Sequence, residues 1–141
     1  MFKNLLLMKS VAVNQDAALL ALRWFTLVSL FLRHGLEKVF TFSAMTAHFP
    51  DPLHIGVVPS LLFAMLSDSI CSVLIIVGLA TRWAALIVFT NIAVAWAFVH
   101  HFQFFGPGAD HGELMVLYLG VMITLILAGP GKYSIDRWIA S

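Results

Sequence analysis

Four long runs of apolar residues dominate the pattern along this chain. None of them alternates apolar and polar positions with a period of two, so the pattern favours helices over the strands of a membrane barrel. A helix needs ~20 residues to cross the hydrocarbon core of a bilayer, and each run has roughly that length. We therefore predict one all-α membrane domain over 1–141, with four spans at about 17–40, 60–80, 83–102 and 111–128.

The segments between the runs carry residues that end helices. Pro50, Pro52 and Pro59 place a loop after the first run, and Gly, Pro and Gly occupy 106–108 after the third. The second connection, 78–82, and the third are short, which makes neighbouring helices antiparallel. The predicted fold is therefore an integral membrane four-helix bundle.

Composition supports this prediction. Of the 141 residues, 61% are hydrophobic and 11% are charged, and the formal net charge is +1. Soluble domains have about 45–50% apolar and about 25% charged residues. The composition excludes an ordinary soluble enzyme, a disordered chain and a nucleic-acid-binding protein with a basic face, and it makes the lipid bilayer the first partner. The lone Cys71 leaves no internal disulfide and no C-x-x-C redox pair.

Basic residues are distributed unevenly between the two ends of such a bundle. If both termini lie on one side, most of the basic residues lie there with them: Lys3, Lys9, Arg23, Arg82, Lys132 and Arg137. Arg33 and Lys38 fall on the other side. Because positive residues favour the cytoplasmic side, we predict that both termini are cytoplasmic.

With this orientation, every histidine and most carboxylates lie in the outer half of the bundle or in its outer loops. His34 and Lys38 are four residues apart and share a helix face, while Asp68 and Glu113 reach a similar depth on the second and fourth runs. A lone charge in hydrocarbon costs about 2.5–3.5 kcal/mol, so these groups should face one another rather than lipid. We predict that the four side chains converge in one outer pocket.

Two interpretations of this pocket stay open. In the structural one, Lys38 and Asp68 form an ion pair that holds the bundle together. In the functional one, the pocket binds a ligand, and Asp68 and His34 act together in proton handling, since ionisable residues inside a membrane usually serve function. His100 or His101 would lie on the rim. Aromatic side chains in the same half would supply an apolar slot: Phe31, Phe98, Phe102 and Tyr118.

Two short runs carry more specific information. One, G-L-A-T-R-W-A-A-L, begins at Gly78, and the other, G-P-G-K-Y-S-I-D, begins at Gly129. Together with an H-G-x-x-K motif that begins at His34, an acid in the second run and Glu113 at the start of the fourth, they make the chain resemble the DoxX family. The resemblance covers about 17–138. It implies a multi-pass four-helix protein of the bacterial inner membrane, generally described as an oxidoreductase component.

The resemblance also implies roles for particular residues. Some members are similar to the small subunits of a thiosulfate:quinone oxidoreductase, and others look like membrane anchors for enzymes that handle thiols and oxidative stress. The family's histidine, lysine and acidic positions map here onto His34, Lys38, Asp68 and Glu113. The acid of the second helix is more often Glu in the family, and Asp68 is one methylene shorter.

Quinone chemistry moves two electrons and two protons, and it requires an apolar slot, donors to the carbonyl oxygens and a proton route. The predicted pocket offers these features. The sequence shows no C-x-x-C-H haem attachment, no iron–sulfur cysteine set and no Rossmann glycine fingerprint. A soluble or membrane-bound redox partner, or a bound prosthetic group, would have to deliver the electrons.

Three functions are therefore open at this point. The first is a quinone-linked oxidoreductase subunit. The second is a non-catalytic membrane anchor or assembly factor for a redox or metal-handling system. The third is a haem or metal site, for which His34 and either His100 or His101 lie at comparable depth. No helix carries the Glu-x-x-His pair of di-metal bundles, so we assign no metal ligands. A homo-oligomer is compatible with all three.

Overall fold

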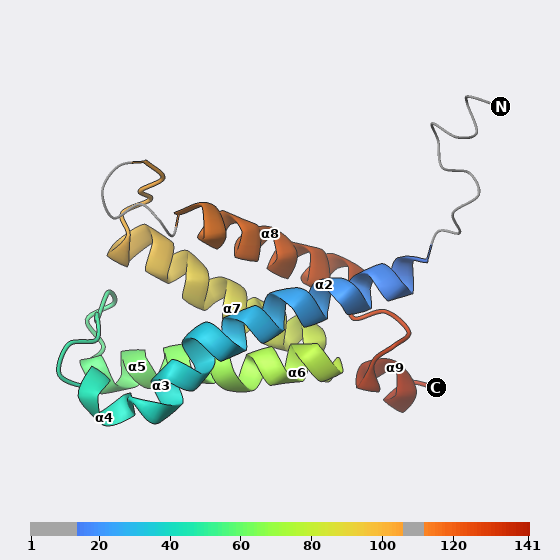
Figure 1. Ribbon diagram of the computed structural model, residues 1–141, viewed down its shortest axis with the longest axis horizontal. Helices are drawn as coiled ribbons and strands as arrows, with labels where there is room; N and C mark the ends of the chain where they lie inside the picture. Colours follow the sequence, from blue (N-terminus) through green and yellow to red (C-terminus); the bar gives the residue numbers. More distant parts are fainter. Residues whose placement is uncertain (1–13, 106–111) are drawn as a thin grey trace.

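The computed structural model describes residues 14–105 and 112–141, and all regular secondary structure in these ranges is helical (Figure 1). The helix α8 (Gly112–Ala128) is apolar and packs along α7 (Thr81–Val94). The predicted helical class is thus confirmed for the described residues. Within them, three further helices are long and apolar enough to cross a membrane: Gln15–Phe40, Val57–Val77 and Thr81–Val99.

Each of the three long helices combines α-helical segments with one π-helical segment, which carries the label η. The first consists of α2 (Gln15–Leu30), η1 (Phe31–Gly35) and α3 (Leu36–Phe40). The second consists of α5 (Val57–Met65), η2 (Leu66–Cys71) and α6 (Ser72–Val77). The third consists of α7 (Thr81–Val94) and η3 (Ala95–Val99). Two short helices complete the described chain: α4 (Phe42–Met45) and α9 (Ile135–Ile139).

The helix ends differ slightly from the sequence prediction. The second helix ends at Val77 rather than residue 80 because Gly78 takes a left-handed φ of +76°. The third ends at Val99 rather than residue 102, and His101 follows with a φ of +48°. The predicted connection at 106–108 and the predicted start of the fourth run at residue 111 lie outside the described residues.

The three long helices and α8 lie side by side and share one core (Figure 1). Each of them contributes a fully buried side chain to that core: Leu27, Ile75, Val88 and Met122. Large apolar side chains also cover the outside, as shown by Phe25 with 82% of its surface exposed. Helices that are apolar on both their inner and their outer faces are typical of membrane spans.

The two motif runs at Gly78 and Gly129 meet at one end of the bundle. The Asp136 carboxylate accepts hydrogen bonds from the backbone N–H groups of Ala80 at 2.6 Å and Thr81 at 2.9 Å. The Asp136 N–H donates to the Gly78 carbonyl at 2.8 Å. Since the first N–H groups of a helix have no partner within it, Asp136 acts as the cap for α7. The C-terminal run therefore holds the turn between α6 and α7.

Arg23 of α2 joins the same end of the bundle. Its side chain is fully buried and donates hydrogen bonds to the carbonyl oxygens of Ile75, at 3.3 Å, and Tyr133. Gly78 has a φ of +76°, and a Cβ atom there would lie 2.9 Å from Cα of Ser134 as well as 2.1 Å from Nη1 of Arg23, so this position strongly favours glycine. Arg23 is thus a structural link between helices, although the sequence grouped it with the other basic residues of this side.

The first and second long helices come into close contact at Gly35. The Ser69 hydroxyl donates to the Gly35 carbonyl at 3.0 Å. A Cβ atom on Gly35 would lie 2.5 Å from the backbone oxygen of Asp68, a separation that no side chain tolerates. The glycine of the H-G-x-x-K motif therefore allows η1 and η2 to touch through their backbones.

Gly35→Ala is expected to lower the thermal stability of the detergent-solubilised protein, because the added methyl group forces η1 away from η2. Overpacking of this kind costs about 1–3 kcal/mol. Gly120→Ala is the matched control, since nothing lies within 4 Å of a Cβ atom at Gly120. Thermal unfolding followed by circular dichroism compares the two variants with the wild type. Equal unfolding midpoints for the two variants would contradict the close contact at Gly35.

Candidate functional site

A buried ion pair links the first and second long helices. Nζ of Lys38 lies 2.8 Å from Oδ2 of Asp68, and the two side chains are only 10% and 7% exposed. Oδ1 of the same carboxylate accepts hydrogen bonds from the Asn91 amide and the Ser67 hydroxyl, both at 3.1 Å. Lys38 also donates to the His34 carbonyl at 3.4 Å. One carboxylate therefore connects residues from three helices, and both of its oxygens are satisfied.

A cavity of about 280 Å³ lies beside this ion pair. The three long helices and α8 all contribute to its walls. The polar part of the lining consists of His34, Lys38, Asp68, Asn91, His100 and Tyr118. The larger apolar part consists of Leu30, Phe49, Pro50, Ala64, Ile92, Ala95, Val99, Leu114 and Met115. A mostly apolar cavity with a few convergent polar groups is typical of sites that bind small organic molecules.

The three π-helical segments all reach this cavity. His34 belongs to η1, Asp68 to η2, and Ala95 and Val99 to η3, and all four residues line it. A π-helical turn holds an extra residue compared with an α-helical turn, and such turns occur frequently at functional sites. The three long helices are therefore locally widened where they enclose the same space.

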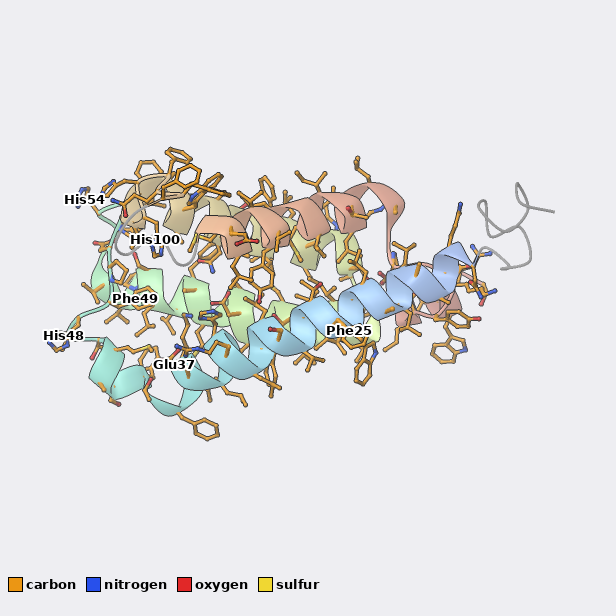
Figure 2. The ribbon with its side chains drawn as sticks, turned by 45° about the horizontal axis from the view of Figure 1, so that its top comes forward. Phe25, Glu37, His48, Phe49, His54 and His100 are labelled. Carbon is orange, nitrogen blue, oxygen red and sulfur yellow. The ribbon has the colours of Figure 1, made fainter. Side chains whose placement is uncertain are left out.

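The loop between α4 and α5 covers the cavity. Phe49 and Pro50 line it from this loop, and Figure 2 shows Phe49 and His100 at the end of the bundle away from α9. The Asp51 carboxylate holds the loop by accepting hydrogen bonds from the Ser60 hydroxyl at 2.7 Å and from the N–H groups of Ile55 and Gly56. The Ser60 hydrogen bond, helped by these two N–H groups, holds the pKa of Asp51 below its usual value. Asp51 is therefore a carboxylate anchor for the loop at neutral pH.

The structure brings together most, but not all, of the residues predicted from the sequence. His34, Lys38 and Asp68 line one cavity, together with His100 and Tyr118. The prediction that Glu113 also converges there was wrong. Glu113 is exposed and lies outside the cavity lining, because it is five positions before Tyr118 and so points ~140° away from it around α8.

The remaining predicted residues do not line the cavity. His101 is exposed, and Phe98 and Phe102 expose 55% and 61% of their surfaces. Phe31 is half-buried and packs beside Gly35, where it would lie 3.1 Å from an added Cβ atom. The apolar slot is formed instead by aliphatic residues of the three long helices and α8, with Phe49 and Tyr118 as its aromatic members.

Asn91 is the site residue that the sequence reasoning did not assign. It lines the cavity and binds Asp68 from the third helix. Its signal in the sequence is a single amide inside an otherwise apolar run, which is costly in a membrane unless the amide has a partner. Among the described residues, no group of three His, Cys, Asp or Glu side chains is placed to hold a metal ion.

Comparison with known proteins identifies the family of the chain. Residues 18–101 match the DoxX family. The chain belongs to the DoxX family. The matched part contains the three helices that supply Lys38, Asp68 and Asn91, so the site of this DoxX protein lies mainly within the region that defines the family.

Two relatives of this DoxX protein are uncharacterized proteins of Haemophilus influenzae strain Rd. One is 31% identical over 137 residues, which cover 93% of this chain and 89% of the relative. The other is 35% identical over 82 residues, which cover 56% of this chain and 61% of the relative. No solved structure gives a significant match.

Lys38→Met and Asp68→Leu are each expected to destabilise the bundle strongly, because each leaves an unpaired charge in a buried site. Loss of one partner of a buried pair costs about 3–5 kcal/mol, whereas replacement of both by apolar residues is often neutral. The double variant should therefore unfold at a higher temperature than either single variant. Thermal unfolding of the four proteins in one detergent measures this coupling. Additive losses in the double variant would contradict a direct ion pair.

Proposed function

We propose that this DoxX protein is a quinone-linked component of a membrane oxidoreductase, with the quinone head group bound in the cavity beside Lys38 and Asp68. The observation that carries the proposal is the buried ion pair in the wall of a mostly apolar cavity. A quinone needs an apolar site for its ring and polar donors for its two carbonyl oxygens. The Lys38 ammonium and the Asn91 amide are donors of this kind.

In the proposed reaction, two electrons from a redox partner and two protons convert the quinone to the quinol. One O–H bond forms at each carbonyl oxygen, and the partner is oxidised. Asp68 and His34 handle the protons, since both line the cavity and titratable side chains are the usual donors in such steps. The partner is a redox protein or a protein-bound prosthetic group, and the quinone-binding chain supplies the site in the membrane.

The presence of a second cavity favours an amphiphilic ligand over a water-soluble one. This apolar cavity of about 300 Å³ shares a wall with the first, formed by Phe49, Pro50, Ala64, Asn91, Ala95 and Val99. Its other walls include Phe63 of α5, which is 39% exposed, and Val94 of α7. It is suited to the isoprenoid tail of a quinone whose head group lies beside Asp68, with the tail leaving between α5 and α7.

The proposed topology has four spans in the inner membrane of a bacterium, with both termini cytoplasmic. The first described turn of α2 and the short helix α9 lie at the same end of the bundle (Figure 1). The described part of α8 has 17 residues, which is within the range of ~17–25 residues that span a bilayer. Arg82, Lys132 and Arg137 lie at the end of the bundle where α9 is found, as the positive-inside rule requires for the cytoplasmic side.

The alternative proposal is a non-catalytic membrane anchor or assembly factor for a redox system. It is favoured by the complete satisfaction of the Asp68 carboxylate, which accepts hydrogen bonds on both oxygens and is paired with Lys38. A carboxylate in this state can serve purely to hold three helices together. The two proposals differ in what happens to turnover when the carboxylate is neutralised.

Asp68→Asn is expected to lower quinone-linked turnover by ~10²-fold or more, because general acid–base groups typically contribute 10²–10⁴-fold. Turnover is measured in membranes as electron transfer from a thiol donor to a quinone analogue and is normalised to folded protein. Gly120→Ala is the control for an innocuous change in the bundle. A well-folded Asp68→Asn protein with full turnover would overturn the proton-handling role and favour the anchor.

Val94→Trp is expected to weaken the binding of a quinone with an isoprenoid tail more than the binding of the same quinone without a tail, because the indole ring fills the second cavity. Leu86→Trp is the matched control, since Leu86 lies on the same helix with 43% of its surface exposed and lines neither cavity. Quinone binding is followed by quenching of tryptophan fluorescence. Equal weakening of both quinones would contradict the proposed tail site.

A further inference from the structure

A basic hollow lies at the end of the bundle opposite the cavity. It has a volume of about 710 Å³ and is lined by residues from the start of α2 and α7, the end of α8 and the segment through α9. Three cationic side chains reach it: Arg82, Lys132 and Arg137. Neither the ion pair nor the quinone proposal uses this hollow, so its chemistry requires a separate explanation.

The two carboxylates in the hollow do not offset this charge fully. Asp136 is engaged by the N–H groups of Ala80 and Thr81 at the start of α7. Asp16 accepts a hydrogen bond from the Lys132 N–H at 2.8 Å and lies 3.7 Å from Nζ of Lys132. Asp16 therefore offsets Lys132 and Asp136 offsets one guanidinium group, so the three cations and two carboxylates of the lining leave one net positive charge.

Arg82 is held in place and still has donors to offer a ligand. Arg82 donates from Nη2 to the Leu127 carbonyl at 3.2 Å, which fixes its side chain at the end of α8. A guanidinium has five N–H donors, so this single hydrogen bond leaves others for an anion. Arginine binds phosphate with two parallel hydrogen bonds, which makes it the preferred cation for phosphate recognition.

Three exposed apolar residues directly precede or follow residues that line the hollow. Trp83 directly follows Arg82 and is 73% exposed, and Trp138 directly follows Arg137 and is 79% exposed. Leu127, whose carbonyl binds Arg82, is 74% exposed. Tryptophan next to arginine at the end of a membrane bundle is typical of the interface between head groups and acyl chains.

We propose that this hollow binds the phosphate of an anionic phospholipid, with Arg82 and Arg137 as its donors and the acyl chains packed against Trp83, Trp138 and Leu127. A net positive hollow whose lining residues are followed or preceded by exposed apolar residues fits a lipid, because a lipid carries a charged head group and apolar chains in one ligand. Basic pockets between helices on the cytoplasmic side of a membrane bind anionic head groups in this way. The assignment is independent of the quinone proposal.

The test uses the full chain in phosphatidylcholine vesicles that contain phosphatidylglycerol. Acyl-chain bromination of one lipid or the other reports which lipid lies next to the tryptophans, through quenching of their fluorescence. We expect brominated phosphatidylglycerol to quench more strongly than brominated phosphatidylcholine at the same mole fraction. Arg137→Gln should reduce the relative affinity for phosphatidylglycerol about fivefold, the scale of one interfacial charge. Arg137→Lys should retain most of the preference.

Arg33→Gln is the matched control for the loss of one positive charge. Arg33 lies on the first helix toward the other end of the bundle, and its side chain is 68% exposed. This variant should keep the preference for phosphatidylglycerol. The proposal is overturned if the wild type shows no preference, if folded Arg137→Gln keeps it, or if Arg33→Gln loses it equally. Binding of inorganic phosphate by a wild type that shows no preference for phosphatidylglycerol would identify a soluble anion instead of a lipid.

Discussion

The contact between Lys38 and Asp68 is the interaction on which the arrangement of the bundle depends. Charges buried in a membrane protein are costly unless they are paired and hydrogen-bonded, so these two side chains fix which faces of the first and second helices meet. The backbones of the two helices come close where Gly35 meets Asp68, the Ser69 hydroxyl bonds to the Gly35 carbonyl, and the amide of Asn91 brings the third helix to the same carboxylate. The cavity is a consequence of this junction, because the widened helical turns around it leave space beside the ion pair.

The two ends of the bundle have different roles. At one end, Asp136 and Arg23 tie the C-terminal run to α2, α6 and α7 through backbone groups. These contacts explain why position 78 is a glycine and why the second motif run ends in an acid. Neither residue needs a role in chemistry. The titratable side chains that share a cavity lie at the opposite end, beneath the loop held by Asp51. The two motif runs at Gly78 and Gly129 are therefore largely structural, whereas the candidate chemistry depends on the H-G-x-x-K motif and Asp68.

Much of this arrangement could be predicted from the sequence, and the misses have physical causes. Run length and the absence of two-residue alternation were sufficient for the helices, and the cost of lone charges was sufficient to bring Lys38 to Asp68. Depth along a helix does not determine the direction of a side chain around it, which is why Glu113 was wrongly placed with the pair. The π-helical segments change that direction further, and nothing in the residue pattern locates them. The loop residues Phe49 and Pro50 are brought over the cavity by tertiary contacts that sequence spacing does not encode.

The most direct measurement of the central claim is the distance between Nζ of Lys38 and the carboxylate carbon of Asp68 in lipid bilayers. Solid-state NMR on protein labelled with ¹⁵N in the lysine side chain and ¹³C in the aspartate side chain gives this distance through the dipolar coupling. A direct ion pair predicts a strong coupling that disappears in Lys38→Met and persists in Gly120→Ala. A wild-type protein that is folded in bilayers but shows no coupling between these two atoms would contradict the account.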